Sequence, residues 1–363
     1  MSNKKIKVLY TIPNFDTAGS GKVVYDLIHG LDRTQFDIAI AVEHSRGHFF
    51  EEVEKLGVPI YIQPVSTAYR PYLSLYGRIK KIASFIKDHQ FDVVHSWHWS
   101  SDWTEVLAAK LGGAKFVYTK KAMSWGNKHW KIRSYLSDFI VTINHEMVNY
   151  FPKKAAQKLI PLGIDTEYYS PQGFQKSVNE KFQIVSVANL VEVKGIEVLI
   201  EAVELLNDDE IEVKIVGDTR SDYAQNLIKS IEEKGKQQQI KFLGKKPDVR
   251  PYLVASDVYV IPTLNKGRKE GMPMALVEAM CMATPTLGSD ISGINYVLKD
   301  FPDLLFEASN AQILAEKIKA LKSKTEEERT LLGKELRAYC VKNFTMKKFI
   351  DEHEKLYKKM TNS

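Results

Sequence analysis

The sequence predicts an α/β protein built from two consecutive doubly wound parallel-sheet units, and three observations support this prediction. Short β-branched or aromatic runs alternate with helix-length amphipathic runs, which is typical of parallel sheets covered by helices on both faces. The alternation stops at a turn-rich stretch, residues 161–171, and then starts again. A length of 363 residues suits two domains of ordinary size.

In the first half, the runs that predict strands are separated by two clear helical patterns, residues 21–31 and 75–89. The predicted strands are residues 6–12, 36–42, 60–62, 91–95, 115–119 and 138–143.

The second half repeats this arrangement. A helical pattern with an apolar stripe covers residues 196–206, and a final amphipathic stretch covers residues 346–360. The predicted strands are residues 182–188, 212–216, 240–243, 258–261 and 285–288. We therefore expect domains at residues 1–165 and 166–345, with a C-terminal helix at 346–363 packing back on the first domain. Open α/β sheets bind ligands beyond the carboxyl ends of their strands, so a cleft between the two domains is the expected site.

Composition narrows the class of protein. Hydrophobic residues make up 44% and charged residues 26%, the balance of a globular protein that is soluble. Cys281 and Cys340 are too few for a disulfide framework and lack metal-ligand spacing, which favours a reducing, cytoplasmic compartment. No run approaches the roughly 20 apolar residues of a membrane span, and the N-terminus lacks a signal-peptide pattern. We expect a cytoplasmic protein, either free or attached to the inner membrane surface.

The formal net charge of +6 is concentrated in the first half, because residues 1–170 carry 22 Lys/Arg and 16 Asp/Glu while the rest is balanced. Such an excess suits an anionic substrate or peripheral contact with anionic lipid, and solubility alone is the competing explanation. Nucleic acid is disfavoured as a partner, because the excess is modest and no recognition motif is present.

The chemistry centres on a loop-to-helix segment. Residues 260–263 predict a strand that ends in a loop, and a helix is expected to begin near Pro273 and to continue past Glu278. The free N–H groups at such a helix start favour a diphosphate. Glu270, just before the expected helix, can accept hydrogen bonds from sugar hydroxyls. Glu278, inside the helix, can accept hydrogen bonds from ribose hydroxyls. Spacing alone fits an ordinary solvated helix face, but apolar neighbours and a following strand with small flanking residues favour a site.

The segment Glu270-Gly-Met-Pro-Met-Ala-Leu-Val-Glu-Ala-Met280, followed by Ala283-Thr-Pro285 and Gly293-Ile294, resembles the signature of family 4 retaining glycosyltransferases. That family has the GT-B fold, two Rossmann-like domains that face a deep cleft. Weaker matches extend the resemblance over nearly the whole chain: Leu162-Gly-Ile-Asp-Thr-Glu167 with Ser170-Pro171, Lys194-Gly195, Phe242-Leu-Gly244, Asp248-Val249, Tyr252-Leu253 and Ala255-Ser-Asp257.

This resemblance implies a role for each matching residue. Glu278 would hold the donor ribose, Glu270 would contact the sugar near its reacting carbon, and Lys194 would neutralise the leaving diphosphate. The backbone of Gly271, Met272, Pro273 and Met274 would line the sugar and diphosphate, and the other expected donor-binding positions are Asn189, Gly217, Lys245 and Val249. The donor would be a nucleoside-diphosphate sugar, with a UDP-sugar favoured, and neither a cofactor nor a metal ion is expected.

One position departs from the family pattern. An arginine usually stands a few residues before the phosphate-binding lysine, where this chain has Asn189. Either another cation replaces it, with Lys266, Arg268 and Lys269 as candidates, or stabilisation of the leaving group is weaker. The alternative hypothesis is therefore a catalytically weak or silent partner subunit.

The first half is expected to bind the acceptor. The stretch Thr17-Ala-Gly-Ser-Gly-Lys-Val23 lacks the spacing of a phosphate-binding P-loop, so Gly19 and Gly21 predict a loop that lets the backbone approach the acceptor side. Two histidines follow the fourth predicted strand. His98 is favoured as the residue that reaches the cleft and acts in catalysis, because it lies beyond the end of the strand. His95 is the alternative, and a structural role is open for each histidine.

Tryptophans also gather in the first half. They are Trp97, Trp99, Trp103, Trp125 and Trp130. Indole rings stack on sugars, although a local aromatic core would produce the same clustering. Together with the positive charge of Lys120, Lys121 and residues 128–133, the cluster predicts an acceptor that is a carbohydrate, either anionic or carried on a phospholipid. Trp97 and Lys121 are the expected acceptor-side residues of this cluster. The predicted function is a hexosyl transfer in surface polysaccharide or glycoconjugate assembly. An oxidoreductase is disfavoured because no Gly-x-Gly-x-x-Gly turn follows a strand, and a phosphorylase of the same fold is a weaker alternative.

Overall fold

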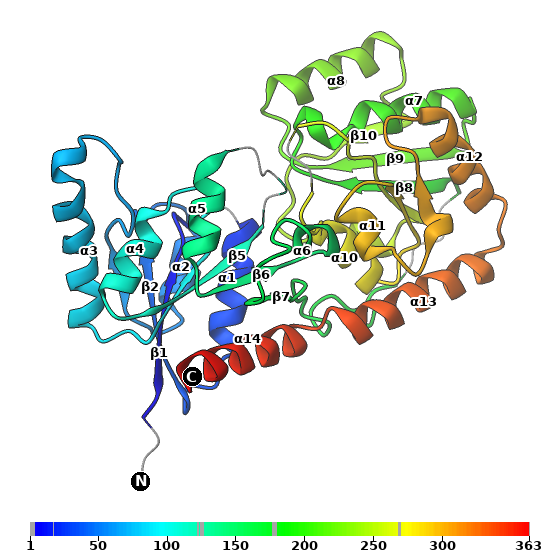
Figure 1. Ribbon diagram of the computed structural model, residues 1–363. Coiled ribbons are helices and arrows are strands. Elements are labelled where there is room, and N and C mark those ends of the chain that lie inside the picture. Colours follow the sequence, from blue (N-terminus) through cyan, green and yellow to red (C-terminus); the bar gives the residue numbers. More distant parts are fainter. Residues whose placement is uncertain are drawn as a thin grey trace. The chain divides into compact units, whose positions relative to one another are not determined.

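The computed structural model describes residues 4–16, 18–121, 123, 127–175, 180–267 and 270–362. The chain forms two compact units, Met1–Gly163 with Met346–Ser363, and Ile164–Thr345. Each unit consists of a parallel sheet with helices on both faces (Figure 1). The α/β prediction of two doubly wound sheets is therefore confirmed.

In its described part, the first unit has a seven-stranded sheet in the order β3-β2-β1-β4-β5-β6-β7. The strands are β1 (Ile6–Thr11), β2 (Phe36–Val42), β3 (Ile60–Ile62), β4 (Val93–Ser96), β5 (Lys115–Lys120), β6 (Phe139–Thr142) and β7 (Gln157–Leu159). The helices are α1 (Ala18–Gly30), α2 (His48–Glu54), the 3-10 turn η1 (Tyr72–Ser74), α3 (Leu75–Asp88), α4 (Thr104–Leu111), α5 (Lys128–Leu136), α6 (His145–Val148) and α14 (Met346–Thr361).

The second unit has a six-stranded sheet over its described residues, in the order β10-β9-β8-β11-β12-β13. The strands are β8 (Phe182–Val187), β9 (Ile211–Val216), β10 (Ile240–Phe242), β11 (Val258–Ile261), β12 (Thr286–Ser289) and β13 (Leu305–Phe306). The helices are η2 (Glu192–Lys194), α7 (Ile196–Leu206), α8 (Asp222–Glu233), α9 (Arg250–Val254), α10 (Met274–Cys281), α11 (Ile294–Val297), η3 (Pro302–Leu304), α12 (Ala311–Lys322) and α13 (Glu326–Asn343).

The order of each sheet reverses once. In the first unit the reversal lies between β1 and β4, and in the second between β8 and β11. At such a point the loops that leave two neighbouring strands diverge to opposite faces of the sheet, which opens a crevice for a ligand at the carboxyl ends. The fold therefore gives each unit one defined position where binding residues are expected.

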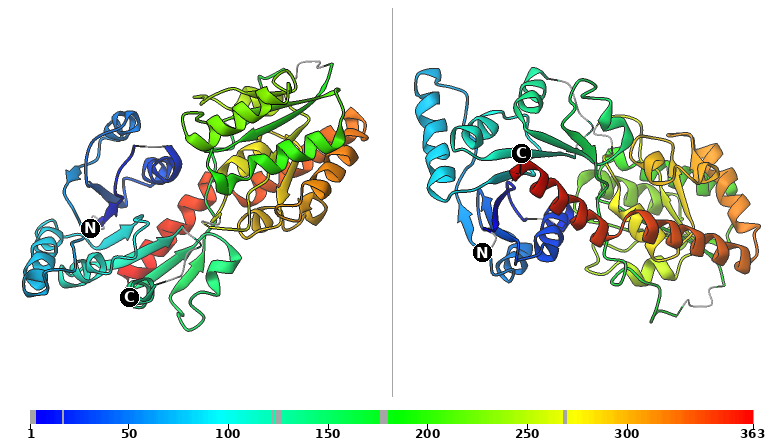
Figure 2. Two further views of the ribbon diagram at one scale, coloured as in Figure 1. Left: turned by 90° about the horizontal axis from the view of Figure 1, so that it is seen from above. Right: turned by 60° about the horizontal axis from the view of Figure 1, so that its bottom comes forward.

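The C-terminal helix α14 packs on the first unit, as its contacts show. Tyr357 forms a hydrogen bond of 2.7 Å with the hydroxyl of Tyr10 in β1. Phe349 lies edge-on to Trp97 with ring centroids 6.4 Å apart. A side chain at Gly30 of α1 would meet Ile350 at 2.1 Å, so α14 closes tightly over α1 (Figure 2). The amphipathic pattern at 346–360 thus serves the core of the first unit.

One local prediction was wrong, and two short strands were not predicted. β7 and β13 were not predicted, because two or three residues are too few for a periodic pattern. Gly19 and Gly21 lie in the first turns of α1 rather than in a loop. A side chain at Gly21 would meet the ring of Phe15 at 3.0 Å, so this glycine serves helix packing, while the space beside Gly19 is open.

In the part of the chain that the structure describes, no helix is both long enough and apolar enough to cross a membrane.

Candidate functional site

The second unit brings Lys194 and Glu270 together at its sheet reversal. Lys194 ends η2, which follows β8, and Glu270 lies between β11 and α10. The Lys194 Nζ and Glu270 Oε1 atoms form an ion pair whose side chains are 23% and 16% exposed. A cation and a carboxylate, 76 positions apart in sequence, therefore lie together at the strand-order reversal, the position where this type of sheet binds its ligands.

The backbone holds these two loops against each other. The amide of Leu264 donates a 2.8 Å hydrogen bond to the carbonyl of Val193. Gly195 has a φ of +62°, and a Cβ atom there would lie 2.2 Å from the carbonyl oxygen of Pro262. Only glycine tolerates both the left-handed conformation and this approach. The position of Lys194 is thus fixed by its neighbour in sequence.

A third loop closes on the same place. Gly293, which follows β12, has a φ of +87°. A Cβ atom on it would lie 2.6 Å from the carbonyl oxygen of Glu270 and 2.8 Å from that of Gly271. The small residues after β12 were predicted to let the backbone approach a ligand closely. Gly293 instead allows a close approach to the protein's own backbone at Glu270 and Gly271, and it thereby fixes the position of Glu270.

The helix expected after Glu270 is α10. Pro273 is its N-cap and Met274 its first residue. Gly271, Met272 and Pro273 are buried, while Met274 is half-buried. The amides of Leu276 and Val277 donate to the carbonyl of Pro273 at 3.1 Å and 3.3 Å. The N–H groups of Met274 and Ala275 come before them and have no carbonyl one turn earlier in the helix, and the positive end of the helix dipole lies there. Together with Lys194, this end of α10 provides the electrostatics that suit an anionic group.

Glu278 lies inside α10 and is half-buried. It shares a hydrogen bond with Tyr169. Burial is the main cause that raises the pKa of the Tyr169 hydroxyl above its usual range, and the negative charge of Glu278 adds to it. The hydroxyl therefore stays protonated and donates to the carboxylate. Tyr169 was missed because it lies in a stretch interpreted only as a linker, where the pair Tyr168-Tyr169 was the available signal.

The other predicted donor residues lie at further strand ends of this unit. Gly217 follows β9, and a Cβ atom on it would lie 2.2 Å from the carbonyl oxygen of Ala188. Asn189 is exposed in the loop after β8, and Lys245 is exposed in the loop after β10. Val249 is half-buried and caps α9. Of the three cations proposed to replace an arginine, Lys266 is exposed, while Arg268 and Lys269 lie outside the described residues.

In the first unit, His98 lies two residues beyond the end of β4, as predicted, but it is 4% exposed. Burial lowers the pKa of its imidazole, and the Glu105 charge partly opposes this effect. Over the described residues, its Nε2 atom is buried without a hydrogen-bond partner. An unsatisfied polar atom at a strand end is a placement that suits contact with a ligand.

Beneath His98 lies a buried ion pair that sequence reasoning missed. Arg133 and Glu105 are 2.7 Å apart and fully buried. Burial acts to raise the pKa of the Glu105 carboxyl, but the Arg133 charge, with His98 and the hydroxyls of Thr11 and Ser96, lowers it below its usual value. Glu105 also accepts hydrogen bonds from Thr11 and Ser96, the last residues of β1 and β4. The pair thus ties together the two strands at the sheet reversal. Two charged residues 28 positions apart give no sequence pattern that could predict it.

His95 lies within β4 and is wholly buried. Its ring nitrogens are 2.6 Å from the Tyr357 hydroxyl and 2.7 Å from the Thr119 hydroxyl. Burial keeps the pKa of this imidazole well below its usual range. Because both ring nitrogens have partners inside the first unit, His95 has the environment of a structural histidine. The sequence had left both this role and a binding role open.

The tryptophan cluster divides between core and surface. Trp97 is fully buried and Trp130 is buried, whereas Trp99 is 43% exposed. Lys121 lies over both Trp97 and Trp99, with its Nζ atom 5.4 Å and 5.3 Å from the ring centroids. Trp125 lies outside the described residues. A local aromatic core accounts for Trp97 and Trp130. Trp99 is the exposed ring beside Lys121, whose ammonium also donates to the carbonyl oxygen of Trp97.

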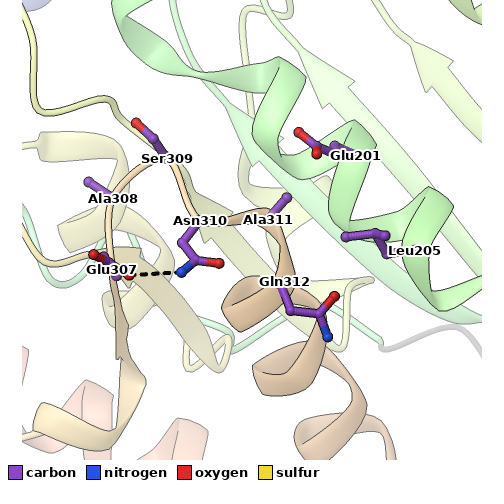
Figure 3. Close-up of a pocket in the computed structure, with 8 residues that line it drawn as sticks. All are labelled: Glu201, Leu205, Glu307, Ala308, Ser309, Asn310, Ala311 and Gln312. Atoms are coloured by element: carbon purple, nitrogen blue, oxygen red, sulfur yellow. Dashed lines mark hydrogen bonds between the residues drawn. The ribbon is translucent and has the colours of Figure 1, made fainter.

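Two further observations concern alternative sites. Among the described residues, no group of three or more His, Cys, Asp or Glu side chains is arranged to hold a metal ion. A surface hollow of about 480 Å³ lies between α7 and the start of α12, lined by Glu201, Leu205 and residues 307–312 (Figure 3). Its one drawn interaction joins Glu307 and Asn310 at 2.7 Å, and none of the predicted site residues lines it.

The comparisons with known proteins agree with this geometry. Residues 17–168 match the model of Glycosyltransferase Family 4, and residues 172–343 match that of Glycosyl transferases group 1. The capsular polysaccharide biosynthesis glycosyltransferase CapH of Staphylococcus aureus is 24% identical over 83% of this chain and 86% of its own length.

Two other similar proteins cover nearly the full chain. The UDP-Gal:alpha-D-GlcNAc-diphosphoundecaprenol alpha-1,3-galactosyltransferase of Escherichia coli is 23% identical over 98% of this chain and 97% of its own. The crystal structure of Anabaena HepE in complex with UDP superposes with a TM-score of 0.81 and 18% identity over 98% of this chain and 100% of that one, which shows a shared fold. With both halves matched and the two sheets in place, the chain belongs to the family 4, group 1 glycosyltransferases and has their GT-B fold.

Proposed function

We propose that this glycosyltransferase moves a sugar from a UDP-sugar to a carbohydrate or lipid-diphosphate acceptor, with retention of the anomeric configuration, during assembly of a surface polysaccharide. The observation that carries the proposal is the Lys194–Glu270 pair at the sheet reversal, beside the N-terminus of α10. The names of the relatives support the biological setting, since CapH acts in capsular polysaccharide biosynthesis and the Escherichia coli enzyme acts on a diphosphoundecaprenol acceptor.

The donor would lie along the loop-to-helix segment. The diphosphate would take the α10 N-terminus and the Lys194 ammonium, both of which stabilise the negative charge that grows on the leaving group. Glu270 would accept hydrogen bonds from sugar hydroxyls. Glu278, held by Tyr169, would accept from the ribose hydroxyls. Because two sources of positive potential face the leaving group, the reaction needs no divalent ion in this proposal.

Transfer with retention would take place on one face of the sugar. The departing phosphate oxygen would accept the proton of the acceptor hydroxyl as that hydroxyl attacks the anomeric carbon. The protein's contribution is then orientation and charge stabilisation rather than a nucleophile. His98, whose imidazole pKa is lowered by burial and whose Nε2 atom has no hydrogen-bond partner among the described residues, would contact the acceptor bound to the first unit.

Binding and turnover need separate tests. A thermal-shift panel of UDP-, GDP-, ADP- and CMP-sugars identifies the donor, because a ligand at about 100 times its dissociation constant stabilises the folded state by about 2.7 kcal/mol. We expect a clear rise in Tm with one UDP-sugar and none with the other nucleotides. A rise with a GDP-sugar alone would contradict the choice of base, and no rise with any donor would contradict the proposed site.

A second candidate function, a catalytically silent partner subunit, is motivated by Asn189. It predicts a donor-dependent rise in Tm with neither hydrolysis nor transfer of the donor sugar. The intact Lys194–Glu270 pair favours turnover, and we expect slow hydrolysis of the bound UDP-sugar by the pure protein even without an acceptor. Transfer products analysed by NMR would then give the anomeric configuration and test retention directly.

A further inference from the structure

We propose that an apolar tip on the first unit, formed by Tyr72, Leu73 and Tyr76, docks this protein on an anionic phospholipid surface. The relative exposure of these side chains is 67%, 102% and 67%. They are three large apolar side chains within five consecutive positions. Elsewhere in the described chain, exposed large apolar side chains occur at most in pairs over such a span, as Ile132 and Tyr135 do. An exposure above 100% means that Leu73 projects beyond its surroundings.

The conformation of the apolar tip is stabilised by hydrogen bonds from Arg78. The Arg78 Nε atom donates to the Thr67 hydroxyl at 2.9 Å, and its Nη2 atom donates to the carbonyl of Ala68 at 2.7 Å and of Pro71 at 3.3 Å. Its Nη1 atom donates to the Ser74 hydroxyl. One guanidinium thus binds residues before and after Tyr72 and Leu73, and it stabilises the turn that exposes them.

The helix that continues the tip is anchored on its opposite side. Ile79, Ile82 and Ile86 of α3 are buried in the core under the sheet. Figure 1 shows α3 at the edge of the first unit, on the outside of α4. Burying Tyr76 or Leu73 against this unit would require α3 to rotate and expose those isoleucines. The apolar tip therefore faces outward because the core fixes the helix.

The surroundings of the apolar tip are basic. Between Glu54 and Asp88 the sequence has six Lys/Arg and no Asp or Glu. Lys80 and Lys87 lie four and eleven positions after Tyr76, which places them on the same side of α3, and both are exposed. Arg70, also exposed, precedes the tip and lies over the ring of Tyr72 at 5.8 Å. An apolar centre is thus flanked by cations at both ends.

This arrangement fits a lipid surface better than a protein partner. Stable protein interfaces bury about 1,200 Å² or more over a fairly broad contact, which three projecting side chains do not offer. A few apolar side chains that enter the interface suffice for peripheral binding when cations attract anionic headgroups. Tyrosine suits this region because its ring is apolar and its hydroxyl reaches water. The occupant to which we commit is a bilayer that contains anionic phospholipid.

The inference goes beyond the proposed function, since it concerns where the enzyme works rather than what it transfers. Contact with the bilayer would bring the first unit to an acceptor carried on a lipid diphosphate. Vesicle binding requires neither donor nor acceptor, so the two proposals fail independently. A protein that turns over a UDP-sugar but ignores vesicles would overturn only the inference made here.

The test is cosedimentation of the full-length protein with phosphatidylcholine vesicles, with and without phosphatidylglycerol. We expect binding to the anionic vesicles that weakens as salt rises, because exposed charges are screened. The variant Tyr72→Ser/Leu73→Ser/Tyr76→Ser should lower the partition coefficient by at least about tenfold, given the apolar area removed. The variant Lys80→Glu/Lys87→Glu should lose binding to anionic vesicles without gaining binding to neutral ones.

The matched control is Leu331→Ser on α13, where the leucine is 59% exposed and should not affect binding. Melting curves of every variant check the fold, and Lys80→Glu/Lys87→Glu changes only exposed side chains. No binding by the wild type, or equal binding by the triple serine variant, would overturn the proposal. Self-association of the wild type that disappears in the triple variant, with no vesicle binding, would assign the apolar tip to a second copy and would also overturn it.

Discussion

Lys194 and Glu270 form an ion pair across the strand-order reversal of the second sheet, one on the loop after β8 and the other on the loop after β11. Each side chain restrains the other at the place where a diphosphate-sugar is proposed to bind. The relationship joins a residue expected to stabilise the leaving group to one expected to hold the sugar. A change at either residue should therefore affect the placement of both parts of the donor.

Lys194→Ala should reduce turnover by about 100-fold or more, because removing one preorganised group that stabilises transition-state charge commonly has this effect. Lys194→Arg should retain part of the activity, since the positive charge remains. Steady-state transfer from the UDP-sugar found in the binding panel measures both variants. Lys229→Ala is the control, because Lys229 forms an ion pair with Glu233 in the same unit but is 75% exposed. Near-normal turnover in Lys194→Ala would show that another cation serves the leaving group.

Gly195→Ala should destabilise the second unit and weaken donor binding. The new Cβ atom would lie 2.2 Å from the carbonyl oxygen of Pro262, which forces apart the loops that carry Lys194 and Glu270. Gly235→Ala is a matched control, since Gly235 has a φ of +65° and open space around it. The control should cost about 1 kcal/mol from backbone strain alone. Chemical denaturation and the donor-dependent rise in Tm compare the two variants, and equal effects would mean that close approach is unimportant.

The sequence predicts most of this second unit, because its elements carry strong local patterns. The strand at 258–261, the helix at 196–206 and the helix containing Glu278 all stand where they were expected. The Lys194–Glu270 contact could not be predicted from those patterns. It depends on β8 and β11 being neighbours, and strand order is a tertiary property that periodicity does not encode.

The first unit shows a different limit. Its strands are buried on both faces, so they read as continuous apolar runs in which side-chain parity carries no information. Nothing in the sequence around His95 could reveal that both of its ring nitrogens are satisfied inside the unit. The Glu105–Arg133 pair is equally hidden, because it forms only when α4 and α5 pack on the same sheet.

Tyr169→Phe should raise the KM for the donor several-fold with a smaller effect on kcat. The change removes the hydroxyl that donates to Glu278, so the position of that carboxylate is less restrained. Loss of one such hydrogen bond costs about 1 kcal/mol in stability or binding. Tyr168→Phe controls for removal of a hydroxyl next to it, since Tyr168 is 46% exposed and contacts Arg250 mainly through its ring and backbone. Kinetics that change equally in both variants would argue against a role of Tyr169 in placing Glu278.

The stability of the first unit should fall as the pH drops from about 6.5 to about 4, and His353 is one identified cause. Burial lowers the pKa of His353 from 6.5 to about 4. Its Nδ1 atom lies 2.7 Å from the carbonyl oxygen of Phe349, and its ring stacks on buried His95 at 5.5 Å. Below pH 6.5 the unfolded chain binds a proton at this histidine, whereas the folded chain does not until about pH 4. The unfolded state is therefore favoured as the pH falls.

For His353 alone this difference amounts to roughly 3 kcal/mol across that interval, and it vanishes above pH 6.5. His353→Phe keeps the ring and removes the titration, so its free energy of unfolding should depend less steeply on pH, with the remaining slope supplied by groups such as His95. Tryptophan fluorescence during urea unfolding reports on this unit selectively, because all five tryptophans lie between residues 97 and 130. His29→Phe, at an exposed position of α1, should keep the wild-type slope. If His353→Phe keeps that slope as well, the acid sensitivity of the first unit has another origin.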